Sequence, residues 1–220
     1  MQGRLVVFEG VEGCGKTTQV KRSQVWLTDL LLSNRVLSST PLIVTREPGG
    51  TELCQAIRKL LLLPSTDEPM QDRTELLLYA ADRAQHVEGL LRPQMTSGAL
   101  ILCDRYTDST IAYQGYGRGL DRSLIDQLNH IATGGLQSDL TLWLDVDVEV
   151  GLARARQRGA SDRIEQATLA FHQRVQQGFA QLAQAHPQRI VRIDASHSEA
   201  EVFDHVQAVV ADRIKTWCES

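Results

Sequence analysis

Five short apolar runs recur along the chain, and each is followed by a stretch in which apolar residues return at helical spacing. The runs predict buried strands at residues 5–8, 42–45, 99–104, 140–145 and 189–194. The intervening stretches predict helices at 17–32, 51–62, 73–91, 121–132, 149–158, 165–185 and 198–217. Continuous apolar runs are typical of parallel strands buried on both faces. The pattern therefore predicts an α/β fold, a parallel sheet with helices on both faces.

Proline and glycine mark the interruptions of this pattern. Pro48, Gly49 and Gly50 close the second strand, and residues 64–69 form a predicted loop. A helix expected at 109–114 is predicted to be broken by the glycine-rich run 115–119. Asp121 then caps the next helix. We find no internal repeat or linker, so residues 1–220 are predicted to form one domain, in preference to two small ones.

The composition of the chain argues against several classes of protein. A net charge of -4 argues against a general nucleic-acid-binding protein, but it allows a local basic pocket. The four cysteines form no C-x-x-C pair, so neither a zinc site nor a disulfide framework is expected. No signal peptide precedes the first strand, and no apolar run approaches the roughly 18 residues of a membrane span. We therefore predict a cytoplasmic protein without a membrane partner.

The segment from Gly10 to Thr17 fits the P-loop pattern G-x-x-x-x-G-K-[ST]. The motif requires a strand before it and a helix after it, and both are predicted here, which disfavours a chance glycine-rich turn. Glycines let successive N–H groups point at an anion, and the helix adds its positive end. Lys16 can follow the β- and γ-phosphates, while the Thr17 hydroxyl can coordinate Mg²⁺. The predicted triphosphate-binding residues are Gly10, Val11, Glu12, Gly13, Cys14, Gly15, Lys16, Thr17 and Thr18.

Charged residues also follow the second and third strands, where ligands of open parallel sheets bind. Arg46 follows one strand, and Asp104 and Arg105 end the other. We expect them to meet the P-loop in one crevice, with Asp104 near Mg²⁺ and both arginines forming a second anion site. Asp145 ends the fourth strand similarly, but Asp104 is preferred because arginine and tyrosine follow it. The alternative for the arginines is surface or structural ion pairs.

Two further segments carry candidate chemistry. Tyr79 and Arg83 are four residues apart on a predicted helix and share a face. They either meet one ligand, or Tyr79 packs in the core while Arg83 pairs with a carboxylate in solvent. The predicted lid, residues 154–165, holds four arginines, of which Arg154 and Arg158 share a helix face. Such a segment can close over a triphosphate, with a solvated basic face as the alternative.

Taken together, several of these runs resemble thymidylate kinases. The similarity is carried by residues 10–18, 45–51, 79–83, 104–106, 112–115 and 162–165, and it extends from about residue 4 to residue 195. It implies a P-loop NTPase fold of the nucleoside monophosphate kinase type with a five-stranded parallel sheet. It also implies ATP-dependent phosphorylation of dTMP to dTDP in dTTP biosynthesis, Mg²⁺ as cofactor, and a homodimer.

The resemblance assigns roles to individual residues. The implied dTMP-binding residues are Arg46, Tyr79, Arg83, Arg105, Thr110, Tyr113 and Gln114. Tyr79 would stack on thymine, where the family usually has phenylalanine. The implied metal-site residues are Thr17, Asp104, directly or through water, and Glu12. The implied catalytic residues are Lys16, Arg105, Arg158 and Glu12. Gly13 stands where some members carry a catalytic arginine, so Arg158 of the lid is predicted for that role, as in the bacterial class.

Two other function classes fit part of the pattern. A deoxynucleoside kinase would need a base to activate a hydroxyl group and fewer phosphate-binding arginines. A GTPase switch is disfavoured, because neither N-K-x-D nor D-x-x-G follows the P-loop. The sequence thus favours a nucleotide kinase whose acceptor carries a phosphate.

Overall fold

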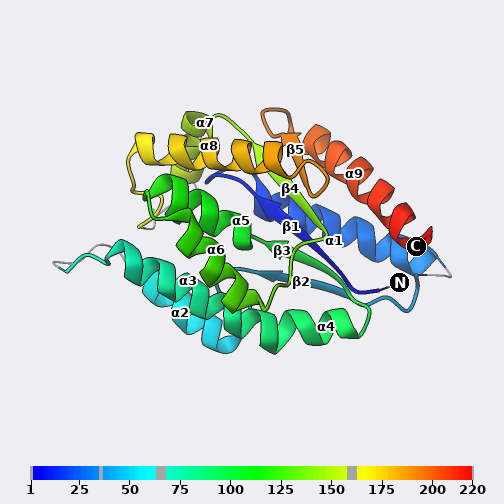
Figure 1. Ribbon diagram of the computed structural model, residues 1–220. Helices are drawn as coiled ribbons and strands as arrows, with labels where there is room; N and C mark the ends of the chain where they lie inside the picture. The colour runs from blue at the N-terminus through cyan, green and yellow to red at the C-terminus, as the bar shows by residue number, and fades with distance from the viewer. Residues whose placement is uncertain (1, 35–36, 63–67, 158–162, 220) are drawn as a thin grey trace.

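Figure 1 shows a twisted sheet enclosed by helices in the computed structural model, which describes residues 2–34, 37–62, 68–157 and 163–219. The strands are β1 Arg4–Glu9, β2 Leu42–Arg46, β3 Leu100–Asp104, β4 Leu140–Asp145 and β5 Ile190–Asp194. They lie in the order β2-β3-β1-β4-β5, and each neighbouring pair is parallel. The predicted α/β fold with a five-stranded parallel sheet is confirmed.

Helices connect the strands and cover the sheet. The α-helices are α1 Lys16–Ser33, α2 Glu52–Leu62, α3 Asp72–His86, α4 Arg92–Thr96, α5 Thr107–Thr110, α6 Arg122–Thr133, α7 Val148–Arg156, α8 Leu169–Ala185 and α9 Glu199–Glu219. Two π-helical stretches join them, η1 Val87–Leu91 and η2 Ile111–Gly117. Asp121 caps α6 as predicted, because its side chain accepts a hydrogen bond from the Ser123 amide. Within the described ranges, no helix is both long and apolar enough to span a membrane.

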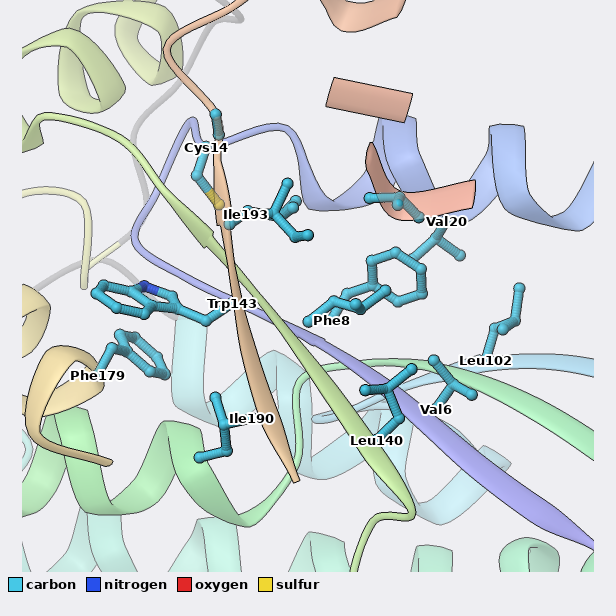
Figure 2. Packing of buried hydrophobic residues seen from close by; sticks show 14 of the residues in the cluster. Val6, Phe8, Cys14, Val20, Leu102, Leu140, Trp143, Phe179, Ile190 and Ile193 are labelled. Atoms are coloured by element: carbon cyan, nitrogen blue, oxygen red, sulfur yellow. The ribbon is translucent and has the colours of Figure 1, made fainter. Parts of the chain in front are cut away.

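The core lies on both faces of the sheet, because successive side chains of a strand point to opposite sides. Val6 and Phe8 of β1 belong to the cluster that packs with Val20 of α1 and with α9. Leu5 and Val7 face the other side and pack against η1. In the same cluster as Val6 and Phe8, Trp143 of β4 stacks on Phe179 of α8, with ring centroids 6.4 Å apart (Figure 2). Burial on both faces explains the continuous apolar runs of the strands.

The strand register brings the carboxyl ends together at one edge of the sheet. Phe8 of β1 and Arg46 of β2 both lie opposite Asp104 of β3. The loop between β1 and α1 begins at the same edge. The sequence-based expectation that three strand ends share one crevice is therefore met by the fold.

The helix predicted to end at residue 114 ends inside the glycine-rich run 115–119, so the predicted break is present but starts three residues later than expected. The helical path continues to Gly117. A Cβ atom added to Gly117 would lie 2.6 Å from the Phe171 ring, and one added to Gly178 would lie 2.7 Å from the Tyr116 ring. These glycines allow η2 and α8 to approach closely, so they serve packing where the sequence suggested a break.

Two predicted helix boundaries also differ from those in the structure. The helix expected from residue 165 begins at Leu169, because Thr168 is its N-cap and accepts a hydrogen bond from the Phe171 amide. The helix expected to end at residue 91 continues through η1 into α4, where Pro93 occupies the first turn. Residue 158, the expected end of another helix, lies outside the described residues.

Candidate active site

A cavity of about 230 Å³ opens at the carboxyl edge of the sheet. Its lining includes fourteen residues predicted from the sequence: Glu12, Gly13, Gly15, Lys16, Thr17, Thr18, Arg46, Tyr79, Arg83, Asp104, Arg105, Thr110, Tyr113 and Gln114. Gly10, Val11 and Cys14 are not part of the lining. Cys14 is 2 % exposed and belongs to the hydrophobic core shown in Figure 2. Arg158 lies outside the described residues, so its predicted role is not tested by this structure.

The P-loop turns on glycines with positive φ angles, which are 142° at Gly10, 71° at Gly13 and 97° at Gly15. These values are easy for glycine and strained for other residues. Lys16 curls back over the loop, and its ammonium donates hydrogen bonds to the carbonyls of Gly10 and Val11, each at 2.9 Å. Lys16 is therefore held above the loop by groups that a phosphate can replace.

Gly13 cannot carry the arginine found at this position in some similar enzymes. A Cβ atom on Gly13 would clash with the carbonyl oxygen of Gly151 in α7. A Cβ atom on Gly151 would in turn lie 2.5 Å from the carbonyl oxygen of Glu12. The P-loop and α7 therefore touch backbone to backbone, which leaves no room for a side chain from either.

The oxygen donors for a metal ion meet between α1 and β3. Thr17 Oγ1 donates a hydrogen bond to Asp104 Oδ2 over 3.2 Å. Asp145, the competing candidate, instead accepts hydrogen bonds from Arg192 at 2.7 Å and from Gln176 at 3.0 Å. In the described part of the chain, no group of three or more His, Cys, Asp or Glu side chains gathers into a metal cage. A hydroxyl and one carboxylate fit Mg²⁺, which keeps several waters and binds nucleotide phosphates.

Arg105 is the centre of the charged network. Its backbone has a φ of 73°, which is unusual for a residue other than glycine. Its guanidinium donates to Glu12 Oε1 at 2.9 Å and to the Tyr113 hydroxyl at 3.0 Å. It also donates to the Gly10 carbonyl and to Ser109 Oγ, both at 3.1 Å. Arg105 thus joins β3, the P-loop and η2 at the cavity wall.

Glu12 is held ionised beside Arg105. Burial alone would raise the pKa of its carboxyl group, but the nearby imidazole of His172 and the charges of Arg105 and Lys16 outweigh burial and lower the pKa to about 2. The Tyr113 hydroxyl also donates to Glu12 over 2.6 Å. His172 Nδ1 lies 3.3 Å from Glu12 Oε2. A permanent negative charge therefore stands next to the proposed metal and phosphate sites.

Arg83 is buried, with only 2 % of its surface exposed, so the arrangement with Arg83 in solvent is wrong. Its guanidinium bonds Glu47 Oε2, Thr110 Oγ1 and Asn129 Oδ1, each at 2.8 Å, and the Tyr106 carbonyl at 3.0 Å. Tyr79 is half-buried and lines the same cavity. Arg83 therefore holds the cavity wall in shape as well as facing the cavity.

The sequence reasoning missed several cavity residues. Arg58 of α2 lies in the lining near Arg46, and its guanidinium donates to the Pro48 carbonyl. Burial and the neighbouring Arg46 lower the pKa of Arg58. Nothing in the spacing of the predicted helix 51–62 distinguished Arg58 from a surface residue. Its position follows from the fold of the loop before α2.

Glu9 was also missed, although it precedes the P-loop directly. Its carboxylate accepts hydrogen bonds from the Tyr106 amide at 2.8 Å and from Ser109 Oγ at 2.6 Å. Burial raises the pKa of Glu9 to about 7, despite the opposing charge of Arg105. A glutamate at the end of an otherwise apolar strand was the available signal. Glu9 fixes the turn after β3 from which Arg105 projects.

The predicted lid begins in α7 and reaches the cavity again beyond the undescribed residues. Arg154 donates to the Ala195 carbonyl over 3.3 Å, away from the cavity lining. Ile164 and Glu165 line the cavity. Arg163 forms an ion pair with Glu75 of α3 at 2.6 Å. The described ends of residues 154–165 are thus attached to the body on both sides of the site.

Comparisons with known proteins point to one family. The family model described as Thymidylate kinase matches residues 8–206. A curated protein from Nostoc punctiforme, named Thymidylate kinase, is 59% identical over 216 residues, covering 98% of this chain and 99% of its own. One of the same name from Cyanothece sp. is 58% identical over 227 residues, with 99% and 97% covered. The crystal structure of thymidylate kinase from Ehrlichia chaffeensis matches with a TM-score of 0.76 and 31% identity, covering 96% of this chain and all of that one.

Proposed function

This chain belongs to the thymidylate kinase family and phosphorylates dTMP with ATP and Mg²⁺, and we propose that the cavity at the carboxyl edge of the sheet performs this reaction. One observation carries the proposal. The P-loop with Lys16, and the separate cations Arg46 and Arg105, line the same cavity. A kinase whose acceptor is itself a phosphate needs two anion sites that face each other, and this arrangement supplies both.

On the donor side, the P-loop would bind the β- and γ-phosphates of ATP. The amides of its glycine turn and the start of α1 provide a positive field for the phosphates. Lys16 would exchange the carbonyls of Gly10 and Val11 for phosphate oxygens, because charged acceptors bind an ammonium more strongly than carbonyls do. Thr17 and Asp104 would hold Mg²⁺, which would supply positive charge against the negative charge that develops during transfer.

On the acceptor side, Arg105 would bind the phosphate of dTMP, with Arg46 beside it. In this structure the Arg105 guanidinium donates hydrogen bonds to Glu12, Tyr113, Ser109 and Gly10. A bidentate phosphate contact would replace part of that set and release the Tyr113 hydroxyl toward the sugar. Tyr79 and Gln114 would contact the base, and Thr110, held by Arg83, would complete the wall.

The chemistry requires no general base in this arrangement. The nucleophile is a phosphate oxygen of dTMP, which is mostly dianionic near pH 7 because the second phosphate pKa is about 6. The residues must instead bring two anions together and hold them in line for transfer. Lys16 and Arg105 would cancel charge on the two sides, and we propose residues 154–165 as the lid that adds Arg158.

Substitution of the two donor-side cations tests the assignment. We expect Lys16→Ala or Arg158→Ala to lower kcat by about a hundredfold or more, the scale for removing one preorganised charge. Arg156→Ala is a matched control within the same arginine-rich segment. Steady-state kinetics with ATP, Mg²⁺ and dTMP would measure both effects. Turnover within threefold of wild type in both variants would contradict the assignment.

We further propose that the protein is a homodimer and that it is cytoplasmic. Large apolar residues are exposed on two helices that contact each other, Leu77 of α3 at 56% and Ile131 of α6 at 76%. Exposed apolar residues of this size are common at interfaces between subunits. Four free cysteines fit a reducing compartment.

A further inference from the structure

Glu75 of α3 is a buried carboxylate outside the cavity lining. It is 0% exposed, and three side chains reach it. Gln114 Nε2 donates to Oε1 over 2.7 Å, while Arg118 Nη2 and Arg163 Nη1 contact Oε2 at 3.0 Å and 2.6 Å. A charge this deep in the protein is costly unless it is paired on every side, as Glu75 is. Nothing in the proposed transfer step uses it.

Glu75 is ionised at neutral pH. Burial would raise the pKa of its carboxyl group, but the charge of Arg118, the hydrogen bond from Gln114 and the charge of Arg163 outweigh burial and lower the pKa. An ionised carboxylate can only accept hydrogen bonds. The amide group of Gln114 therefore faces Glu75 with its nitrogen, because its oxygen would be repelled.

The orientation of the Gln114 amide determines whether a hydrogen-bond acceptor or a donor faces the cavity. The oxygen and nitrogen of a carboxamide point in different directions from one carbon, so the oxygen of Gln114 points away from Glu75 when the nitrogen binds it. Gln114 is 2% exposed and lines the cavity. We propose that Glu75 is a positioning residue that fixes the amide of Gln114 with its oxygen toward the base of the acceptor nucleotide. This inference rests on the proposed contact between Gln114 and that base.

A fixed acceptor atom at this position selects among pyrimidines. Thymine and uracil carry a hydrogen on N3, which can be donated to the Gln114 oxygen. Cytosine has a lone pair on N3, which the same oxygen repels. Without Glu75, the amide could rotate and present its nitrogen to cytosine instead. By fixing the Gln114 amide, Glu75 would make it select thymine and uracil, which carry a hydrogen on N3. Without Glu75, Gln114 could bind cytosine as well.

The experiment compares kcat/KM for dTMP with kcat/KM for dCMP in the full-length protein. In Glu75→Gln, we expect this ratio to fall at least tenfold, since a mispaired polar group at the base edge costs about that factor. Glu75→Asp keeps the charge for both arginines but shortens the side chain by one methylene, and we expect the ratio to fall in the same direction. If Glu75→Gln folds poorly, the ratio measured for Glu75→Asp still tests the proposal.

Two controls separate positioning from stability and from the proposed function. Arg118→Lys keeps a positive charge beside Glu75 and leaves Gln114 unchanged, but it loses the guanidinium contacts with the carboxylate, so the ratio should stay within twofold while the melting temperature falls. Gln114→Ala should raise KM for dTMP and reduce the ratio. If it does so while both Glu75 variants keep the wild-type ratio, the inference is overturned and the proposed function survives. If Gln114→Ala leaves KM and ratio unchanged, the proposed base contact itself is wrong.

Discussion

Two buried carboxyl groups only three residues apart have pKa values shifted in opposite directions. Glu9 has the Tyr106 amide and Ser109 as its hydrogen-bond partners, and burial raises its pKa to about 7. Glu12 is also buried, but His172, Arg105 and Lys16 lower its pKa to about 2. Glu9 therefore anchors the turn that carries Arg105, while Glu12 supplies a fixed negative charge for the arginine itself.

The raised pKa of Glu9 predicts a pH dependence of stability. The unfolded carboxyl titrates near its ordinary 4.5 and the folded one near about 7, so the folded state binds the extra proton between these values. The contribution is fully present below pH 4.5 and is lost as pH rises to 7, a loss of roughly 3 kcal/mol. Glu9→Gln mimics the protonated form, and we expect it to lack this loss.

Urea denaturation of wild type and Glu9→Gln from pH 5 to pH 8 would measure the difference. The free energy of unfolding of wild type should fall relative to that of the variant as pH rises. Comparing the two proteins at each pH cancels the contributions of other groups. Parallel curves over this range would contradict the account of Glu9.

At the scale of elements, the contact between the P-loop and α7 constrains both. Gly13 has a φ of 71°, and its missing Cβ leaves space for the Gly151 carbonyl. The proposed lid begins in α7, so the helix that leads to it is fixed against the P-loop, which we propose as the ATP-binding loop. This close approach also explains why the loop carries no arginine of its own.

We expect Gly151→Ala to weaken ATP binding, because the added Cβ would push against the Glu12 carbonyl. Overpacking of this kind costs about 1 to 3 kcal/mol. KM for ATP should rise more than KM for dTMP, and the melting temperature should fall. Val150→Ala, at a 43% exposed neighbouring position, is the control and should change neither. An unchanged KM for ATP in Gly151→Ala would show that the loop does not depend on this contact.

Elements with a strong local pattern were predictable from sequence, and tertiary roles were not. The strands were found because burial on both faces makes their apolar runs continuous. The P-loop was found because its chemistry dictates residue types at fixed spacing. The break predicted in the run 115–119 is present, but the helix continues to Gly117, which packs closely against Phe171, and spacing does not reveal this packing. Arg58 was missed for the same reason, since only the folded chain brings it beside Arg46.

At the scale of the whole molecule, the proposed homodimer predicts a measurable mass. Light scattering coupled to size exclusion should give about twice the 24.5 kDa of one chain. Leu77→Glu together with Ile131→Glu places charges on the exposed apolar residues of α3 and α6, and we expect this variant to shift toward the monomer. A wild-type protein that elutes with the mass of one chain at micromolar concentration would contradict the dimer.

We propose that the cavity transfers phosphate onto a second phosphate that Arg105 holds. The most direct test is a coupled spectrophotometric assay with ATP and Mg²⁺ on wild type, Arg105→Met and Arg192→Met, with dTMP and thymidine as acceptors. We expect wild type to prefer dTMP, Arg105→Met to lose at least a hundredfold in kcat/KM for dTMP, and Arg192→Met to keep the wild-type value. Thymidine as the better acceptor, or an Arg105→Met variant within threefold of wild type, would contradict it.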